Sequence, residues 1–326
     1  MENNIKKLSR MGLGLAALGR PGYINLGHAS DLHHDYEIAT MESNAHTVLD
    51  AAWAAGIRYF DAARSYGRAE QFLSTWLKSR NTPLESVKVG SKWGYTYTAD
   101  WQIEADNHEI KEHSIAVLQR QIGESKILLA PYLQLYQIHS ATLDSGVLQN
   151  KQVLDKLAQL RADGLQIGLS LSGTKQADTL QRALEIEYDG TLLFGSVQAT
   201  WNLLEQSVTA VLATAHNAGL WVIIKEALAN GRLTPRNNMP DFAKKRALLD
   251  KIAAEKETTI DALALAGVLA QPWVDMVLSG AATVAHLESN VTAVNLTYDP
   301  TSATQLQQLV EPPQVYWQTR SSLAWN

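Results

Sequence analysis

The chain has 326 residues, of which 46% are hydrophobic and 19% are charged, a balance typical of a soluble globular protein rather than a disordered one. It contains no cysteine, which excludes disulfides, thiolate metal ligands and cysteine nucleophiles, and which fits a reducing compartment such as the cytoplasm. A formal net charge of -5 argues against a nucleic-acid partner, and no apolar run is long enough to cross a bilayer.

The first apolar stretch, Met11–Leu18, follows three basic residues and could be mistaken for a secretory signal. It is short and is interrupted by Gly12 and Gly14. Glycines within a strand allow another backbone or a ligand to approach closely. We therefore interpret this stretch as the first strand of the fold.

Short apolar or β-branched runs recur along the whole chain and predict eight strands: Met11–Leu18, Ile57–Asp61, Val87–Ser91, Leu133–Ile138, Leu165–Ser170, Leu193–Ala199, Leu220–Ile224 and Met276–Ser279. Segments with helical periodicity separate these runs: Ala45–Ala55, Ile110–Ile122, Val153–Ala162, Gln176–Leu184, Val208–Ala218 and Ala243–Glu255. A glycine directly follows several of them and predicts a helix end at Gly56, Gly123, Gly164 and Gly219.

Alternation of short strands with amphipathic helices predicts parallel strands joined by right-handed crossovers. Length alone leaves open one large barrel or two ordinary domains. No linker rich in Pro, Gly or Ser divides the chain, and the first strand region lacks the G-x-G-x-x-G fingerprint because Ala17 stands at the third glycine position. We therefore predict one domain over residues 1–326, a closed (β/α)8 barrel, with residues 300–326 as a C-terminal extension.

Catalytic residues of such barrels lie at the carboxyl ends of the strands. These ends are unusually polar in this chain: Asp61 and Tyr66, Ser91 and Lys92, His139 and Ser140, Ser170, Gln198, Lys225 and Glu226, and Ser279 and Gly280. Each residue alone is more often structural than functional, so the prediction depends on several of them meeting at one barrel mouth.

Lys92 would lie at the barrel mouth, where an ammonium group is poorly solvated and needs an anionic partner. Asp61 is the natural partner, and a structural ion pair that closes the top of the barrel is the alternative interpretation. A cation beside a phenol favours the phenolate, so we expect Lys92 to lower the pKa of Tyr66 from about 10. His139 could hydrogen-bond to a carbonyl oxygen that Tyr66 protonates, although a histidine at a strand end is often structural.

These four residues resemble the catalytic tetrad of the aldo-keto reductase family. Asp61 and Tyr66 lie in FDAARSYGRAE, Lys92 in VGSKWGY and His139 in LYQIHS, in the family's order, and the resemblance extends from Gly12 to about residue 290. It implies a barrel that reduces an aldehyde or ketone with hydride from NAD(P)H. Tyr66 would donate the proton, Lys92 and Asp61 would adjust the pKa of Tyr66, and His139 would orient the carbonyl.

The resemblance also implies residues that bind the cofactor. Ser170 and Gln198 match residues that bind the nicotinamide carboxamide, although Leu171 replaces the usual asparagine. Lys225 stands where the family commonly has a tyrosine that stacks on the nicotinamide. Either the aliphatic part of Lys225 covers the ring, or the ring is held less firmly.

The loop Asn230-Gly231-Arg232-Leu233 resembles one that contacts the pyrophosphate, with Arg232 as an anion partner. The segment SGAATVAHLESN resembles the one that holds the adenosine end, and it contributes Ser279, Gly280, Glu288 and Asn290. Gly280 and His286 stand where many members have basic residues for the 2′-phosphate. The family as a whole favours NADP(H) over NAD(H), and we expect the same here.

For the substrate, a small carbonyl compound, we expect contacts from Tyr23, Trp93 and Trp101, with tail aromatics Tyr316, Trp317 and Trp325 around the mouth. The C-terminal extension would then lie over the barrel mouth. The long segment from Trp93 to Glu109 is interpreted as a functional lid. His28, His33 and His34 lack the spacing of a metal site, so we predict no metal.

Two alternatives remain beside an enzyme that acts as a monomer or small homo-oligomer. The first is a cofactor-binding, redox-sensing or regulatory barrel subunit with little turnover, although only about ten residues precede the first strand. The second is a barrel that keeps the tetrad but has lost cofactor binding, an idea motivated by Leu171 and Lys225.

Overall fold

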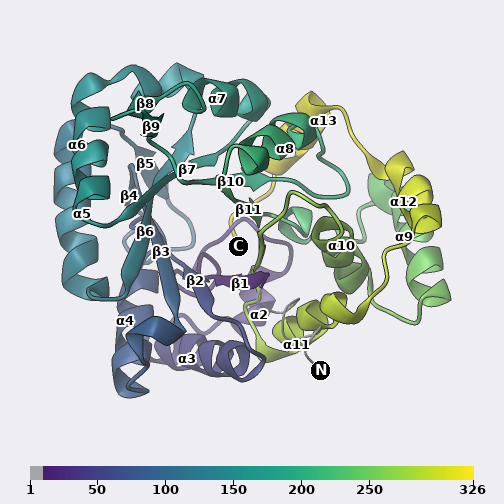
Figure 1. The fold of residues 1–326 in the computed structure, drawn as a ribbon. Coiled ribbons are helices and arrows are strands. Elements are labelled where there is room, and N and C mark those ends of the chain that lie inside the picture. Colours follow the sequence, from purple (N-terminus) through teal and green to yellow (C-terminus); the bar gives the residue numbers. More distant parts are fainter. Residues whose placement is uncertain (1–9) are drawn as a thin grey trace.

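The computed structural model describes residues 10–326, and the basic residues Lys6 and Lys7 lie outside this range. A closed barrel of eight parallel strands forms its centre, in the order β1-β12-β11-β10-β7-β6-β3-β2 (Figure 1). The (β/α)8 prediction is therefore confirmed. The barrel strands are β1 (Met11–Gly14), β2 (Tyr59–Asp61), β3 (Lys88–Trp93), β6 (Leu133–Ala141), β7 (Gln166–Leu171), β10 (Ser196–Thr200), β11 (Trp221–Lys225) and β12 (Met276–Ser279).

Helices surround the barrel, and none within residues 10–326 is long and apolar enough to cross a membrane. They are α2 (His28–Asp31), α3 (Ile38–Ala54), α4 (Ala69–Ser79), α5 (Ile115–Leu129), α6 (Lys151–Ala162), α7 (Gln176–Ala183), α8 (Thr209–Asn217), α9 (Ala243–Glu255), α10 (Ile260–Leu269), α11 (Val284–Thr292), α12 (Pro300–Leu306) and α13 (Pro313–Ser321). Single 3₁₀ turns lie at Leu84–Ser86, Leu143–Ser145, Val147–Gln149, Ala229–Gly231, Pro240–Phe242, Ala293–Asn295 and Gln307–Leu309.

The barrel closes between its first and last strands. In β1, Leu13 is opposite Ser279 of β12, and Gly14 is opposite Asp61 of β2. Because all eight strands are parallel, their carboxyl ends meet at one mouth. This register brings residues from the start and the end of the chain to the same place.

Several predicted boundaries are wrong, including the helix starts at Ala45, which lies inside α3, and at Ile110, which lies in a short strand. The first strand ends at Gly14 rather than Leu18, because Leu18 N–H donates to the Leu15 carbonyl at 3.1 Å and the chain turns there. Helix α5 continues through Gly123 to Leu129, because its buried positions continue beyond the glycine. Gly56, Gly164 and Gly219 follow helices with φ of 94°, 98° and 89°, the left-handed conformation that suits a helix end.

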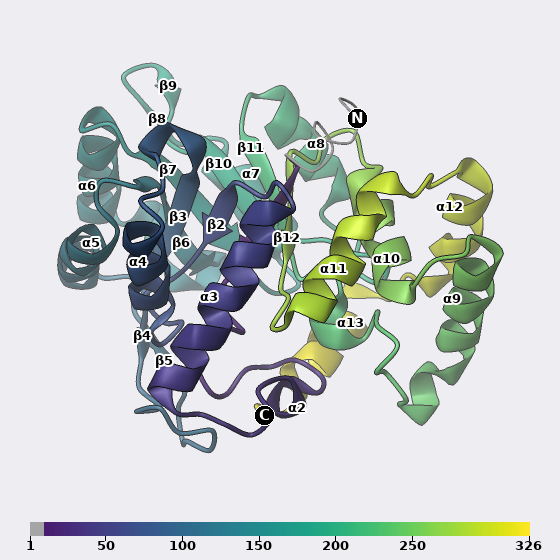
Figure 2. The ribbon, with the colours of Figure 1, turned by 90° about the horizontal axis from the view of Figure 1, so that it is seen from below.

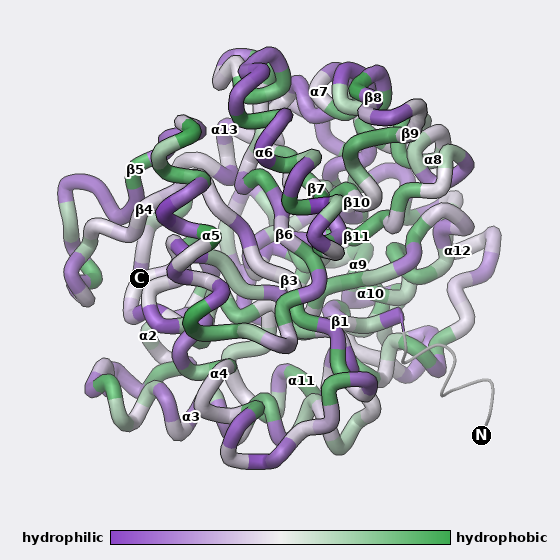
Figure 3. The backbone as a smooth tube through the Cα atoms, turned by 60° about the vertical axis from the view of Figure 1, so that its left-hand side comes forward, coloured by the Kyte–Doolittle hydropathy of each residue, from purple (hydrophilic) through white to green (hydrophobic). Residues whose placement is uncertain are grey.

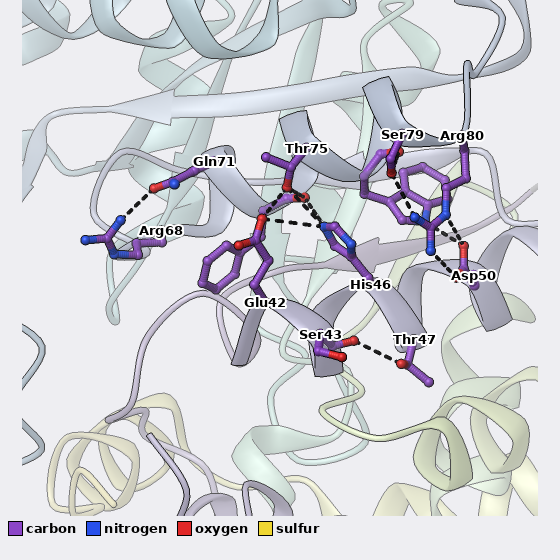
Figure 4. Close-up of polar contacts among 12 residues, drawn as sticks. Glu42, Ser43, His46, Thr47, Asp50, Arg68, Gln71, Thr75, Ser79 and Arg80 are labelled. Atoms are coloured by element: carbon purple, nitrogen blue, oxygen red, sulfur yellow. Dashed lines mark hydrogen bonds and ion pairs between the residues drawn. The ribbon is translucent and has the colours of Figure 1, made fainter. Parts of the chain in front are cut away.

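Most of the outer helices are amphipathic, and hydrophobic and hydrophilic residues alternate along them in Figure 3. Figure 4 shows how polar side chains join α3 to α4: Arg80 Nη2 lies 2.7 Å from Asp50 Oδ2, and His46 Nε2 lies 3.0 Å from Thr75 Oγ1. Both side chains of the Asp50–Arg80 ion pair are about 40% exposed or more, so it contributes about 1 kcal/mol at most. The packing of these helices in the fold is therefore stabilised mainly by their buried inner faces.

The segment after β3, expected to be a long loop, contains an antiparallel hairpin of β4 (Tyr95–Tyr97) and β5 (Glu109–Lys111). In Figure 2 this hairpin, helix α2 and the C-terminus lie at the same end of the barrel. Arg20, which follows β1, donates to Glu109 at 2.9 Å. The hairpin is thus attached to the mouth at its second strand, and Trp101 in the segment between its strands packs on Phe72 of α4.

The C-terminal residues pack over the barrel mouth as expected, and the C-terminus lies near the centre of the ring of strands in Figure 1. Asn326 and Tyr23 exchange backbone hydrogen bonds of 3.1 and 3.3 Å. Trp325 stacks on His108 with ring centroids 4.0 Å apart. Tyr316 and Trp317 do not line the mouth, because they are buried in a hydrophobic cluster with residues of α9, α10 and α12.

Candidate active site

Four polar residues predicted from the sequence meet at the barrel mouth. Asp61 ends β2, Lys92 lies near the end of β3, His139 lies near the end of β6, and Tyr66 lies in the loop between β2 and α4. The loop is fixed locally, since Tyr66 N–H donates to the Ala63 carbonyl at 3.1 Å. Neighbouring strands of one parallel sheet thus deliver the whole group.

Asp61 is the centre of a buried polar network. Its carboxylate forms an ion pair with Lys92 and accepts hydrogen bonds from Tyr59 at 3.0 Å, Gln198 at 3.0 Å and Gln137 at 3.4 Å. A Cβ at Gly90 would lie 2.4 Å from the Tyr59 hydroxyl, so glycine leaves room for Tyr59 to reach the carboxylate. Several donors therefore compensate a carboxylate that is almost fully buried.

Lys92 connects this network to Tyr66. Its ammonium also donates to the Ala62 carbonyl at 3.0 Å and, at the long limit of 3.5 Å, to the Tyr66 hydroxyl. Burial raises the pKa of Tyr66 well above its ordinary value, and the charge of Asp61 adds to this effect. The expected net lowering of the Tyr66 pKa is therefore wrong, because burial and the charge of Asp61 outweigh the effect expected of the Lys92 ammonium group. Tyr66 stays protonated at neutral pH, which is the state that a proton donor needs.

His139 lies beside Tyr66, with ring centroids 5.4 Å apart and the rings nearly perpendicular. Its Nδ1 is 3.4 Å from Ser65 Oγ, and its carbonyl accepts a hydrogen bond of 2.9 Å from Nε2 of His113. Burial lowers the pKa of His139 well below its ordinary value, and the cations Lys92 and Lys225 lower it further. The imidazole is therefore neutral, with one N–H available as a donor.

Buried neutral histidines make the stability of this protein depend on pH. Burial lowers the pKa of His113 and of His28 to about 4. A histidine that titrates near 6.5 when unfolded then contributes full stability above that pH and loses it progressively down to pH 4. We expect the free energy of unfolding to fall by about 2 kcal/mol for each of these two histidines when the pH is lowered from 7 to 5.

Guanidinium unfolding curves at the two pH values test this expectation, with His113→Gln as the comparison. The variant removes one titrating group, so its loss of stability between pH 7 and pH 5 should be smaller by about 2 kcal/mol. An equal loss in the variant and the parent would show that His113 does not carry the effect.

A cleft of about 420 Å³ opens from the tetrad and continues to the N-terminal part of α11. Most of the predicted site residues line it: Tyr23, Asp61, Tyr66, His139, Gln198, Lys225, Ser279, Gly280 and Asn290. A Cβ added at Gly280 would have nothing within 4 Å, so the backbone there is open to a ligand. Ser170 lies behind the wall, where its hydroxyl accepts a 2.8 Å hydrogen bond from the backbone N–H of Ser140.

Besides Ser170, four of the predicted binding residues lie outside the wall of this cleft. Arg232 is buried in a bidentate ion pair with Glu311, at 2.6 and 3.0 Å. Trp93 is fully buried against His113, and Trp101 packs on Phe72 while its indole N–H donates to the Tyr36 carbonyl. Glu288 is exposed on α11.

The sequence interpretation missed several residues that line the cleft, Arg20, Tyr95, Arg236 and Arg320, and it noted Glu226 at a strand end without giving it a role in the site. Glu226 follows the predicted seventh strand directly, so its position at a strand end was a usable signal. Arg320 has no such signal, because it reaches the mouth from α13, nearly a hundred residues later in the sequence.

The candidate histidines of a metal site are separated in the structure. His28 is buried with its ring edge toward Tyr23, whereas His33 and His34 are exposed. Within residues 10–326 no group of three or more His, Cys, Asp or Glu side chains is arranged to hold a metal ion.

A model of the aldo/keto reductase family matches residues 10–311 of the chain. The chain belongs to the aldo/keto reductase family. It is therefore an oxidoreductase that reduces carbonyl compounds with a nicotinamide cofactor, and no comparison favours the regulatory alternative.

Similar proteins come from fungi and bacteria. The chain is 24% identical to aldo-keto reductase str7 of Strobilurus tenacellus, over 93% of this chain and 88% of the relative. It is 24% identical to the NADH-specific methylglyoxal reductase of Escherichia coli, over 93% and 95%. The holo form of aldo-keto reductase AKR11C1 from Bacillus halodurans has the same fold, with a TM-score of 0.69 at 20% identity over 93% of this chain and 92% of that one.

Proposed function

We propose that Tyr66 is the proton donor of this reductase and that it protonates the oxygen of an aldehyde or ketone as the alcohol forms. The observation that carries the proposal is the position of the Tyr66 hydroxyl, on the wall of the cleft and 3.5 Å from Lys92. Burial keeps the phenol protonated before reaction. The adjacent ammonium group would stabilise the phenolate once the proton has left.

His139 and Asp61 have supporting roles in this proposal. The neutral imidazole of His139 offers an N–H that could hydrogen-bond to the carbonyl oxygen beside Tyr66. Asp61 holds Lys92 in place through their buried ion pair. The proton donor and the cation that stabilises its conjugate base would therefore have fixed positions before substrate binds.

The residues along the rest of the cleft fit a nicotinamide dinucleotide, which when bound supplies the hydride that no side chain can supply. Gln198, Lys225, Ser279, Gly280 and Asn290 are the proposed contacts on the cleft wall. Ser170 lies directly behind that wall. Arg232 and Glu288 are not needed for this proposal.

For the choice of cofactor we propose NADP(H). Two basic side chains, Arg236 and His286, line the α11 end of the cleft, with Arg236 Nη2 2.8 Å from His286 Nε2. They would be suitable partners for a 2′-phosphate. Arg236 also forms an ion pair with Asp31, which offsets part of its charge.

Quenching of tryptophan fluorescence by NADPH and by NADH tests this assignment. We expect NADPH to bind about tenfold more tightly, a difference of about 1.4 kcal/mol in binding free energy. Arg236→Gln should weaken NADPH binding and leave NADH binding nearly unchanged. Tighter binding of NADH by the parent would overturn the proposed preference, and absence of quenching by both would overturn the proposed cofactor site.

A further inference from the structure

The guanidinium group of Arg20 lies among three aromatic rings at the mouth of the cleft. Arg20 follows β1, and its Cζ is 4.8 Å from the ring centroid of Trp325, 5.3 Å from that of Tyr66 and 5.4 Å from that of Tyr23. A cation within about 6 Å of a ring centroid is attracted to the ring, and more strongly where water is excluded. The Arg20 side chain is only 3% exposed, so these contacts are poorly screened. One of the three rings belongs to the proposed proton donor.

Two hydrogen bonds fix the position of this guanidinium group. Arg20 Nη1 donates to the Ser65 carbonyl at 3.0 Å and to Glu109 Oε2 at 2.9 Å. Ser65 directly precedes Tyr66, so the first bond ties Arg20 to the loop that carries the phenol. Arg20 Nε is buried and has no hydrogen-bond partner within the described residues. Glu109 therefore engages one nitrogen of the group, and the aromatic rings provide further attractive contacts.

Tyr66 thus has two cations beside it. Lys92 Nζ lies 4.9 Å from the centroid of the Tyr66 ring and reaches its hydroxyl at 3.5 Å, whereas Arg20 lies against the ring. Resonance spreads part of the negative charge of a phenolate from the oxygen over the ring. A cation at the ring therefore stabilises the phenolate, in addition to a cation at the oxygen.

Other ionisable groups around Tyr66 also act on its proton affinity. Around this phenol lie the cations Arg20 and Lys92, the carboxylates of Asp61, Glu109 and Glu226, the imidazole of His139 and the phenols of Tyr23 and Tyr59. Burial and the charge of Asp61 raise the pKa of Tyr66, the charge of Arg20 lowers it, and the charge of Glu109 raises it. Arg20 and Glu109 are bound to each other, yet their charges act on Tyr66 in opposite directions.

We propose that Arg20 is a positioning residue of this reductase: its guanidinium group holds the loop of Tyr66 and stabilises the negative charge that spreads over the Tyr66 ring as the proton leaves. This inference rests on the proposed function, in which Tyr66 donates that proton. It predicts effects of opposite sign for the two partners of one ion pair. Replacing Arg20 should strengthen the hold of Tyr66 on its proton, whereas replacing Glu109 should weaken it. Loss of a purely structural ion pair would change both variants in the same direction.

Alcohol oxidation, the reverse reaction, measures this effect, because Tyr66 must then start as a phenolate and accept the proton of the alcohol. Below the pKa of Tyr66, kcat should therefore rise with pH. Benzyl alcohol and glycerol are the test substrates, with saturating NADP⁺. Arg20→Met should lower kcat at a given pH by about tenfold and move the pH profile to higher pH. Glu109→Gln should raise kcat at the same pH by about threefold and move the profile to lower pH.

Arg20→Lys keeps the positive charge and should recover part of the rate that Arg20→Met loses. Glu109→Gln keeps an oxygen that can accept from Arg20, so this variant tests the proposal even if Arg20→Met does not fold. Profiles of the two variants that move in the same direction, or that do not move, would overturn the proposal. An effect of Arg20→Met on KM alone would make Arg20 a substrate contact and would also overturn it.

Tyr66→Phe separates failure of this inference from failure of the proposed function. If Tyr66→Phe loses most alcohol oxidation and the Arg20 and Glu109 profiles move in opposite directions, both are supported. If Tyr66→Phe loses it but those profiles do not separate, Tyr66 is the proton donor and Arg20 only supports the barrel. If Tyr66→Phe keeps the rate and the pH profile of the parent, the proposed function fails and the inference fails with it.

Discussion

Replacing Tyr66 by phenylalanine is expected to lower kcat for aldehyde reduction by roughly 10²- to 10⁴-fold, the contribution of a positioned general acid. The phenol lies on the cleft wall beside Lys92 and His139, and the substitution removes its hydroxyl while keeping the ring that contacts them. Affinity for NADPH should change little, because the proposed cofactor contacts come from other residues. Turnover at saturating NADPH and fluorescence titration measure the two quantities.

Tyr95→Phe is the matched control for this experiment. Tyr95 is a second phenol on the cleft wall, and its ring lies 4.9 Å from that of His139. The Lys92 ammonium group donates to Asp61, Ala62 and Tyr66 rather than to Tyr95, so loss of the Tyr95 hydroxyl should reduce kcat far less. If Tyr95→Phe abolished turnover and Tyr66→Phe did not, the proton donor would be Tyr95.

Replacing Lys92 by methionine is expected to lower the free energy of unfolding by about 3–5 kcal/mol, the usual cost of breaking a buried ion pair. The loss leaves the Asp61 carboxylate buried without its cation, although Tyr59 and Gln198 still donate to it. Carbonyl reduction should also fall sharply, because the phenolate of Tyr66 would lose the adjacent positive charge. Guanidinium unfolding and steady-state kinetics at neutral pH measure both effects.

The double variant Asp61→Asn with Lys92→Met distinguishes the structural role of this pair from its catalytic role. Both charges are removed in the double variant, so no buried charge lacks a partner, and the double variant should be more stable than Lys92→Met alone. Its activity should nevertheless stay low. Activity that recovered together with stability would mean that the ion pair only supports the barrel, the alternative interpretation raised by the sequence.

The barrel and the tetrad could be predicted from sequence because their signals are local. Each strand is a short apolar run, and the amphipathic helices between them bury one face, so periodicity identifies both. Asp61, Lys92 and His139 directly end or follow such runs. A parallel barrel brings all strand ends together, which allows three separate positions in the sequence to be placed at one site.

The features that were missed depend on contacts that no local pattern records. Helix α10 has nearly all of its residues buried, so it shows no polar face for periodicity to detect. Trp93 was expected in the substrate pocket because it was taken to lie in a loop, yet it ends β3 and is buried against His113. Arg320 reaches Glu226 across 94 positions of sequence, and only the folded chain shows that pairing.

The residues proposed for proton transfer and those proposed for cofactor binding come from different halves of the sequence. The groups proposed for proton transfer come from β2 to β6, in the first half of the sequence, whereas the proposed cofactor contacts come mainly from β10 to β12 and α11. Cofactor preference could therefore change through substitutions in the second half while the acid stays intact. The hydrogen bond from Gln198 to Asp61 joins the two halves of the sequence. A chimaera that takes its first half from one such reductase and its second half from another would therefore need a residue at position 198 that can donate to Asp61.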